Sequence, residues 1–108
     1  MGSADLFTEL VAMYRKHGWE LRRALLRPKT RVELQSLLPG DLVVRDAEFD
    51  ALWFSRPSHN DREAWELRLL AQTQYALFET FEADETEEER DDLRLEMEAQ
   101  LREYFSRG

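Results

Sequence analysis

Glycine and proline divide the first half of this chain into short segments, and this division constrains the fold more than any other feature. The interruptions are Gly18, Pro28, Pro39 with Gly40, and Pro57. Proline lacks a backbone N–H and restricts the residue before it, while glycine readily adopts the left-handed conformation that ends a helix. Regular elements before residue 57 are therefore short. Apolar residues make up 43% of the 108 residues, which is enough for one core, so residues 1–108 are predicted to form a single domain.

Residues 5–17 have the apolar period of an amphipathic helix. Leu6, Leu10 and Met13 recur at steps of three and four residues, and Gly18 supplies a stop. Residues 19–26 then lie between that glycine and Pro28. This punctuation, with partial alternation of apolar residues, favours a strand, and the spacing leaves a two-turn helix as the alternative.

The segment Thr30-Arg31-Val32-Glu33 matches a capping box, in which the threonine hydroxyl and the glutamate side chain each bond a backbone N–H at the helix start. It predicts a short helix over residues 31–38 that ends at Pro39-Gly40. After this turn, Val43 and Val44 are compatible with a brief strand, and residues 46–50 have the composition of a loop.

Three later segments, residues 50–56, 63–70 and 75–81, are predicted to be strands. In the second of them Trp65, Leu67 and Leu69 alternate with charged residues. The connections between the three segments are short, and parallel neighbours need a crossover of a dozen residues or more, so an antiparallel meander is predicted. A single helix over residues 63–77 is the alternative, because Trp65, Leu69 and Thr73 would share one helical face.

A second capping-box pattern, Thr86-Glu87-Glu88-Glu89, precedes a helical period over residues 87–105. Leu93, Met97 and Leu101 form its apolar stripe. The sequence therefore predicts a two-layer α+β fold, in the order N-terminal helix, strand, short helix, three-stranded antiparallel meander and long C-terminal helix. The helices are expected mainly on one face of the sheet.

The net charge of −8 is unevenly distributed. Residues 1–36 have a balance of +3, and residues 37–108 have a balance of −11. Nucleic-acid binding depends on neutralising phosphates with clustered Lys and Arg, so no nucleic-acid partner is predicted. The first residues carry no basic region of a signal peptide, and no run approaches the roughly 20 apolar residues that span a bilayer. A cytoplasmic protein that does not interact with membranes is predicted.

Catalytic and metal-binding signatures are missing from the sequence. Ser55, Ser58, His59 and Asp61 have the residue types of a hydrolase triad, but they lie within seven residues, whereas triads assemble from separate elements. The chain has no cysteine, and neither His17 nor His59 lies at an i, i+4 spacing from a second ligand on a clearly predicted helix. The four glycines form no phosphate-binding loop. We therefore predict no enzymatic activity, no metal and no cofactor.

Six residues are candidates for binding, because Trp is enriched at interaction hot spots and adjacent arginines form a basic patch. They are Trp19, Arg22, Arg23, Trp53, Phe54 and Trp65. Trp53 and Phe54 are adjacent on a predicted strand, so their rings should point to opposite faces of the sheet. With helices on one face, the other ring needs a cover from a further layer or from a partner.

These features predict a non-catalytic protein–protein interaction module, with an adaptor, chaperone-like or regulatory role, that binds a protein partner or itself as a homodimer. The alternative is a small-molecule-binding domain, or an enzyme that uses carboxylates and arginines in a cleft. The acidic segment Glu82–Asp92 is a docking surface for a basic partner, a weak divalent-cation site, or a solvated linker and helix start. We expect one of its acids within salt-bridge distance of Arg22, Arg23 or Arg27, since adjacent arginines on a strand should point to opposite faces.

Overall fold

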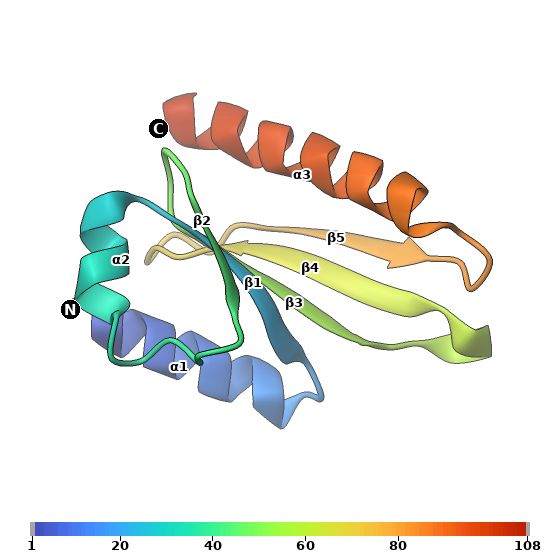
Figure 1. The fold of residues 1–108 in the computed structure, drawn as a ribbon, viewed down its shortest axis with the longest axis horizontal. Coiled ribbons are helices and arrows are strands. Elements are labelled where there is room, and N and C mark those ends of the chain that lie inside the picture. Colours follow the sequence, from blue (N-terminus) through green and yellow to red (C-terminus); the bar gives the residue numbers. More distant parts are fainter. Residues whose placement is uncertain (1, 108) are drawn as a thin grey trace.

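The computed structural model describes residues 2–107, which form a five-stranded sheet between helices (Figure 1). The elements are α1 (Ser3–Lys16), β1 (Glu20–Leu26), α2 (Pro28–Leu34), β2 (Val43–Asp46), β3 (Ala51–Pro57), the short 3-10 helix η1 (His59–Asp61), β4 (Glu63–Leu69), β5 (Ala76–Phe81) and α3 (Glu87–Arg107). The strand order is β2-β1-β3-β4-β5. The predicted α+β class is confirmed.

The sheet is mixed and larger than the predicted meander. Strands β3, β4 and β5 are antiparallel neighbours, as expected from their short connections. Strand β1 extends this sheet as an antiparallel neighbour of β3, and β2 adds to β1 in the parallel direction through the α2 crossover. The alternative of one helix over residues 63–77 is wrong, because β4 and the start of β5 occupy those residues.

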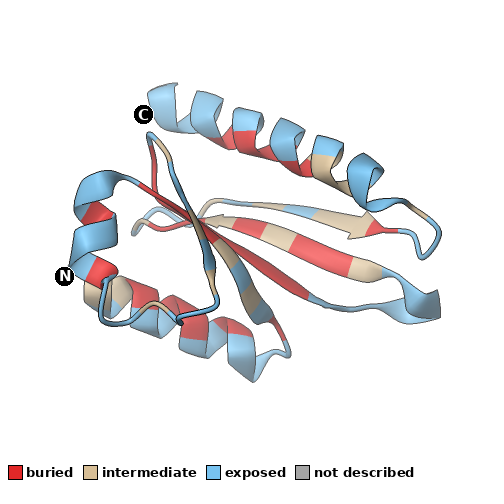
Figure 2. Ribbon diagram, in the orientation of Figure 1, coloured by how far each residue is buried: buried red, intermediate tan, exposed pale blue. Residues whose placement is uncertain are grey.

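The predicted two-layer arrangement with helices mainly on one face is wrong, because helices cover both faces of the sheet. Helices α1 and α2 pack on one face, and α3 packs on the other (Figures 1 and 2). The reason lies in β3, where every residue from Ala51 to Ser55 is buried, so that each face of this central strand needs a cover. Trp53 and Phe54 point to opposite faces as predicted, and both are 0% exposed.

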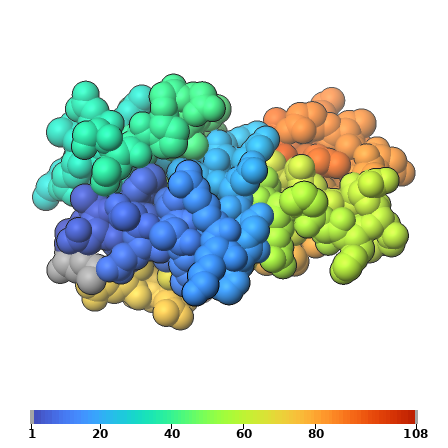
Figure 3. Space-filling view, turned by 90° about the horizontal axis from the view of Figure 1, so that it is seen from below, coloured from blue at the N-terminus to red at the C-terminus, as the bar shows by residue number. Residues whose placement is uncertain are grey.

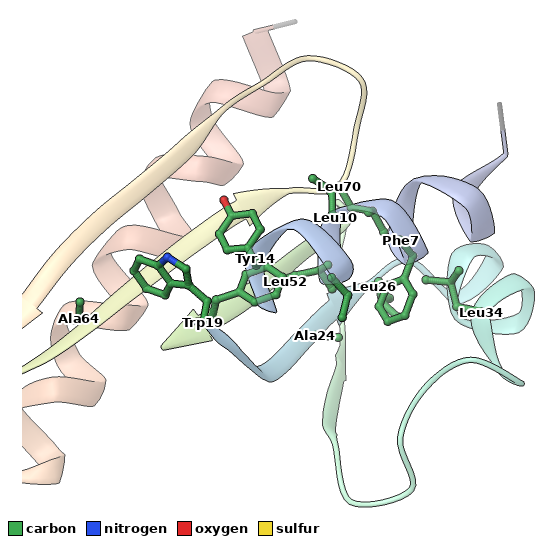
Figure 4. Packing of buried hydrophobic residues seen from close by; sticks show 12 residues of the cluster. Phe7, Leu10, Tyr14, Trp19, Ala24, Leu26, Leu34, Leu52, Ala64 and Leu70 are labelled. Carbon is green, nitrogen blue, oxygen red and sulfur yellow. The ribbon is translucent and has the colours of Figure 1, made fainter. Parts of the chain in front are cut away.

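Each face has its own hydrophobic core. On the α1 side, the ring of Tyr14 stacks on that of Phe54 with ring centroids 4.0 Å apart, and Phe7 and Leu34 lie at the other end of this core (Figure 4). On the α3 side, Trp53 packs edge-on against Trp65 with ring centroids 5.9 Å apart. The two cores explain how so many aromatic residues are buried in a small domain.

Two helix starts were predicted from capping boxes, and one of them is correct. At α3, the N–H of Glu89 donates to the Thr86 hydroxyl over 3.1 Å, and the N–H of Thr86 donates to the Glu89 carboxylate over 3.0 Å. At α2, the predicted start is wrong, because the helix begins at Pro28 and Thr30 lies inside it. The Thr30 hydroxyl instead donates to the buried carboxylate of Asp50 over 2.7 Å.

A β-bulge in β1 corrects the expected orientation of two arginines. Leu21 is opposite Phe54 and Arg23 is opposite Trp53, so Arg22 is an extra residue on β1. The guanidinium groups of Arg22 and Arg23 consequently both lie near the ring of Trp65 on the α3 side, at 5.9 and 5.6 Å from its centroid. The expectation that they point to opposite faces is therefore wrong.

The expected link between this basic segment and the acidic run is confirmed. Arg23 lies 3.5 Å from Asp91 and 3.9 Å from Glu87, both on α3. Arg27 pairs with Asp50 instead, at 2.8 Å. Among the helices of residues 2–107, none is long and apolar enough to cross a membrane.

Candidate functional site

Helix α1 leaves the part of its sheet face formed by β4 and β5 open. Phe54, Glu66 and Phe78 are directly opposite one another on adjacent strands, so all three point to the α1 side. Phe54 is fully buried, Glu66 is half-buried, and Phe78 is 57% exposed. Figure 3 shows this side of the molecule, with the dark blue α1 over one part and the yellow-green atoms of the β3–β4 region beyond it.

We call this surface the open face. Besides Glu66 and Phe78, its residues are Arg68, Ala76 and Thr80, each of which is exposed or half-buried. On the opposite side of the same two strands, by contrast, Trp65, Leu67 and Phe81 are buried beneath α3. The open face is therefore a specific gap in the helical cover of the sheet.

Aromatic residues border the open face next to α1. Trp19 lies beyond Tyr14 in the direction of β4 (Figure 4), and its ring meets that of Phe78 edge-on, with centroids 6.3 Å apart. The guanidinium of Arg56 lies 4.7 Å from the centroid of the Trp19 ring and donates to the carbonyl of His17 over 3.0 Å. A shallow cavity of about 360 Å³ opens at this border, lined by Met13, Tyr14, His17, Trp19, Arg56 and Glu66.

The phenol of Tyr14 links α1 to the open face by donating a hydrogen bond to the carboxylate of Glu66. Burial of the phenol, with the hydrogen bond to Glu66 as the second cause, raises the pKa of Tyr14 to about 12. The hydroxyl is thus neutral at physiological pH and acts as a hydrogen-bond donor. It fixes Glu66 on the side of the open face nearest to α1.

Strand β5 is an edge of the sheet, and its outward backbone groups can be identified. The N–H of Leu69 donates to the carbonyl of Tyr75 over 2.9 Å, so Tyr75 is bonded to β4. Because bonded residues alternate along an antiparallel strand, the backbone groups of Ala76, Phe78 and Thr80 point away from the sheet. The N–H of Thr80 donates to the side-chain carboxylate of Glu79 over 3.2 Å. Within residues 2–107, the outward backbone N–H and C=O groups of Ala76 and Phe78 have no such partner.

The other edge of the sheet, β2, is better protected against pairing. It has four residues, of which Arg45 and Asp46 are charged, and Arg45 is held by Glu98 on α3 at 2.7 Å. Short, charged edge strands resist the addition of a further strand. Strand β5 has six residues, a single charge at Glu79 and no proline or bulge. The two edges are therefore unequal, and β5 is the one suited to pairing.

The open edge is also strongly acidic. The segment from Leu69 to Glu89, which contains β5 and the connection to α3, has seven acidic residues and no Lys, Arg or His. Arg62 and Arg90 reach this end of the sheet from outside the segment and pair with Glu82 and Glu63, at 2.6 and 3.3 Å. Within residues 2–107, Glu79 forms no ion pair. A negative potential along the β5 edge follows.

Of the six predicted binding residues, Trp19 alone lies at this site. Trp53, Phe54 and Trp65 are buried in the two cores, and Arg23 is paired with α3. Arg22 is exposed, 3.6 Å from Glu20, and lines a groove of about 560 Å³ with Arg15, Glu20, Leu21, Pro39, Asp41, Leu42 and Val43. The predicted residues are therefore divided among the two cores, the ion pairs with α3, this groove and the open face.

Sequence reasoning missed Phe78, Glu66 and Tyr14. A signal for Phe78 was present, because the last strand of a meander is an edge unless a later strand covers it, and only a helix follows residues 75–81. Nothing in the sequence indicated the contact between Tyr14 and Glu66, which are 52 positions apart.

The residues that suggested a hydrolase are separated in the structure. Ser55 is buried on β3, while Ser58, His59 and Asp61 are exposed in and before η1. Considering residues 2–107, no group of three or more His, Cys, Asp or Glu side chains is arranged to hold a metal ion. This connection shows the features of a surface turn, with Asn60 and Asp61 in the left-handed region that Asn and Asp tolerate best.

In comparisons with known proteins, no family model, no curated protein and no solved structure matches this chain.

Proposed function

We propose that this protein is a non-catalytic interaction module that binds an extended segment of a protein partner as an additional strand along β5. The observation that supports this most directly is Phe78, a large apolar residue that is 57% exposed on an unprotected edge strand. In strand addition, backbone hydrogen bonds supply affinity and alternate side chains supply specificity. Ala76 and Phe78 offer the backbone groups, and the open face receives the alternate side chains.

The side chain of Phe78 is suited to act as the anchor of such a complex. It points to the same side as Trp19, so an apolar residue of an added strand would pack against Phe78 next to an existing aromatic cluster. Cross-strand pairs of aromatic and apolar residues contribute roughly 0.2–1 kcal/mol each. Affinity would then depend on Phe78 more than on any other single residue of the edge.

Homodimerisation stays a prediction, but it is not needed to cover the rings of Trp53 and Phe54. The rings of Trp53 and Phe54 need no partner, because α3 covers one and α1 covers the other. A second copy would have to bind elsewhere, and β5 is the edge that would accept it. Analytical ultracentrifugation of the wild type and of Phe78→Ser tests this possibility directly.

The proposal is tested with a displayed library of random peptides selected on the purified protein. We expect the selected peptides to bind the wild type and to lose at least tenfold in affinity for Phe78→Ser. They should bind Phe105→Ser normally, because Phe105 is an exposed phenylalanine (41%) on the far end of α3. Hydrogen exchange locates the bound peptide, because a strand added along β5 would protect the amide of Phe78. Peptides that bind both variants equally, or that leave this amide unprotected, would refute the proposal.

The groove of about 560 Å³ favours a second candidate function, the binding of a small charged molecule. It brings together Arg15, Arg22, Glu20 and Asp41, which are the carboxylates and arginines in a cleft that such a function requires. A thermal shift of the wild type with small zwitterionic or dicarboxylic compounds, abolished in Arg15→Gln, would support it. The absence of any shift across such a panel would leave strand binding as the better explanation.

A further inference from the structure

We infer that the segment bound along β5 is basic, with a Lys or Arg opposite Glu79 and further basic residues beside the loop that joins β5 to α3. This inference rests on the proposed function, and it names the chemistry of the partner. The partner that binds along β5 is an extended segment of another protein, and its charge determines whether it binds. A second copy of this chain is the competing partner.

The surface on which the segment would lie carries a surplus of negative charge. Seven acids and no basic residue occupy Leu69–Glu89, and the nearby Arg62 neutralises one of these acids, Glu82. Arg68 lies opposite Ala76 on the open face, so the surplus of negative charge is on the α3 side of β5 and on its continuation into α3. Phosphate-rich or acidic ligands would be repelled there. Complementary potentials steer association and exclude wrong partners, which favours a basic segment.

Glu79 is the one charged residue of β5. It is opposite Trp65 on β4, so its side chain points to the α3 side of the sheet, away from Phe78. A residue of an added strand directly opposite Glu79 would have its Cβ about 4.5–5.5 Å away, close enough for an ion pair with a Lys or Arg. Within residues 2–107 the Glu79 carboxylate forms no ion pair, and the hydrogen bond it accepts from the N–H of Thr80 engages Oε1 without neutralising its charge.

The two faces of the bound strand would meet different surfaces of this protein. Its residues opposite Ala76, Phe78 and Thr80 point to the open face, where Phe78 and Trp19 favour apolar side chains. Its residues opposite Leu77 and Glu79 point to the α3 side, where one position is apolar and the other acidic. In the antiparallel direction, its first residues would lie beside Glu82, Asp84 and Glu85. The expected pattern is thus a basic start, a further basic residue opposite Glu79, and apolar residues opposite Phe78 and Leu77.

A second copy fits this surface less well. Pairing of β5 with β5 of another copy would bring two segments with seven acids each to one interface, and the net charge of −8 would be doubled. Like charges that face each other across an interface cost affinity. Charge complementarity therefore selects the basic partner.

The test uses three synthetic peptides that differ only in charge. The basic peptide is Lys-Lys-Thr-Lys-Val-Val-Thr, designed to pair antiparallel with β5, and its matched versions carry Gln or Glu in place of every Lys. Binding to the full chain is followed by amide NMR shifts and by the exchange rate of the Phe78 amide. We expect the basic peptide to bind at least tenfold more tightly than the Gln peptide, and the Glu peptide not to bind.

The protein variants assign the effect to the edge. The double variant Glu79→Gln, Asp84→Asn should bind the basic peptide with about tenfold lower affinity than the wild type. The control double variant Glu9→Gln, Glu48→Gln removes the same charge from exposed sites on α1 and before β3, and it should change the affinity less than twofold. Equal binding of the basic and Gln peptides along β5 would overturn the basic partner and leave strand addition intact. Self-association through β5, abolished by Phe78→Ser, would likewise replace the basic partner by a second copy. Absence of both peptide binding and self-association at β5 would overturn the proposed function itself.

Discussion

The indole N–H of Trp53 donates a hydrogen bond of 2.9 Å to the carboxylate of Glu98, which joins the centre of the sheet to α3. Glu98 is 8% exposed and also accepts a hydrogen bond from Arg45 at the β2 edge, over 2.7 Å. One buried carboxylate therefore fixes α3 against two strands that are not adjacent.

Glu98→Ala is expected to destabilise the fold by about 2–4 kcal/mol, because it leaves the Trp53 indole and part of the Arg45 guanidinium without their acceptor. Glu98→Gln keeps an acceptor and should cost about half as much. Urea unfolding measures both, with Glu96→Ala, an exposed change on the same helix, as the control. Equal stability of Glu98→Ala and Glu96→Ala would contradict this role.

Asp91 makes the stability contributed by α3 depend on pH in the acid range. Burial of the carboxyl acts to raise its pKa, but the guanidinium of Arg94, followed by that of Arg23, outweighs this and lowers the pKa below its ordinary value. The stabilisation is therefore present above the ordinary value of about 3.9 and is lost as the pH falls through the lower folded-state pKa. Since Asp91 is half-exposed, Asp91→Asn should cost about 0–1 kcal/mol at pH 7. The wild type and the variant should converge in urea unfolding as the pH falls below that value, and a difference that persists there would exclude the ion pairs as its cause.

The Thr86 hydroxyl is expected to contribute to the start of α3. Thr86→Ala should destabilise the protein by about 1 kcal/mol, because the N–H of Glu89 loses its acceptor. Thr86→Ser keeps the hydroxyl and should be close to the wild type. Thr73→Ala, in the exposed turn before β5, provides the matched control, and thermal unfolding compares all four proteins. A cost equal to that of the control would mean that the capping box adds nothing.

Tyr14 predicts a loss of stability at alkaline pH. Its folded-state pKa of about 12 lies above the ordinary value of 10.0, so the associated stabilisation is present below pH 10 and lost as the pH rises through 12. Tyr14→Phe keeps the stack on Phe54 and lacks the ionisable hydroxyl. The wild type should therefore lose stability relative to this variant between these two pH values. Ultraviolet absorbance of tyrosinate should show one of the three tyrosines titrating last. If this last step is missing from the titration of Tyr14→Phe, the last tyrosine to titrate is Tyr14.

The direction of the backbone groups in β5 predicts opposite outcomes for proline at two adjacent positions. Ala76→Pro removes an N–H that points away from the sheet, at the first residue of the strand, where proline is tolerated. Leu77→Pro removes an N–H that bonds to β4 and should destabilise the fold by about 3 kcal/mol. Circular dichroism during urea unfolding checks both variants. If Ala76→Pro were the more damaging of the two, the assignment of the open edge would be wrong.

Much of the fold was predictable because local rules fix its elements. The alternation of Trp65, Leu67 and Leu69 identified β4, and the reciprocal contacts of Thr86 with Glu89 begin α3 as the capping-box pattern implied. The layering was not predictable from these rules alone. Burial of both faces of β3 appears in the sequence as the continuous apolar run Ala51–Phe54, which indicates cover on both sides but not which helix supplies it.

The failures arose where a tertiary contact overrode a local pattern. Thr30 has the right neighbours for an N-cap, but the carboxylate of Asp50 competes successfully for its hydroxyl. Arg22 and Arg23 would alternate on a regular strand, and the bulge turns them to the same side. The open face could not be inferred either, because the exposure of Phe78 depends on how far α1 extends over the sheet.

The separate core beneath α3 has a consequence for synthesis of the chain. On the ribosome, β1 to β5 emerge before α3, and a domain generally folds as a unit once it is complete. Trp53, Trp65 and Phe81 have no cover until Met97 and Leu101 have been added. A nascent chain that ends before α3 therefore leaves these three aromatic residues uncovered, and translational pausing within α3 would prolong that exposure.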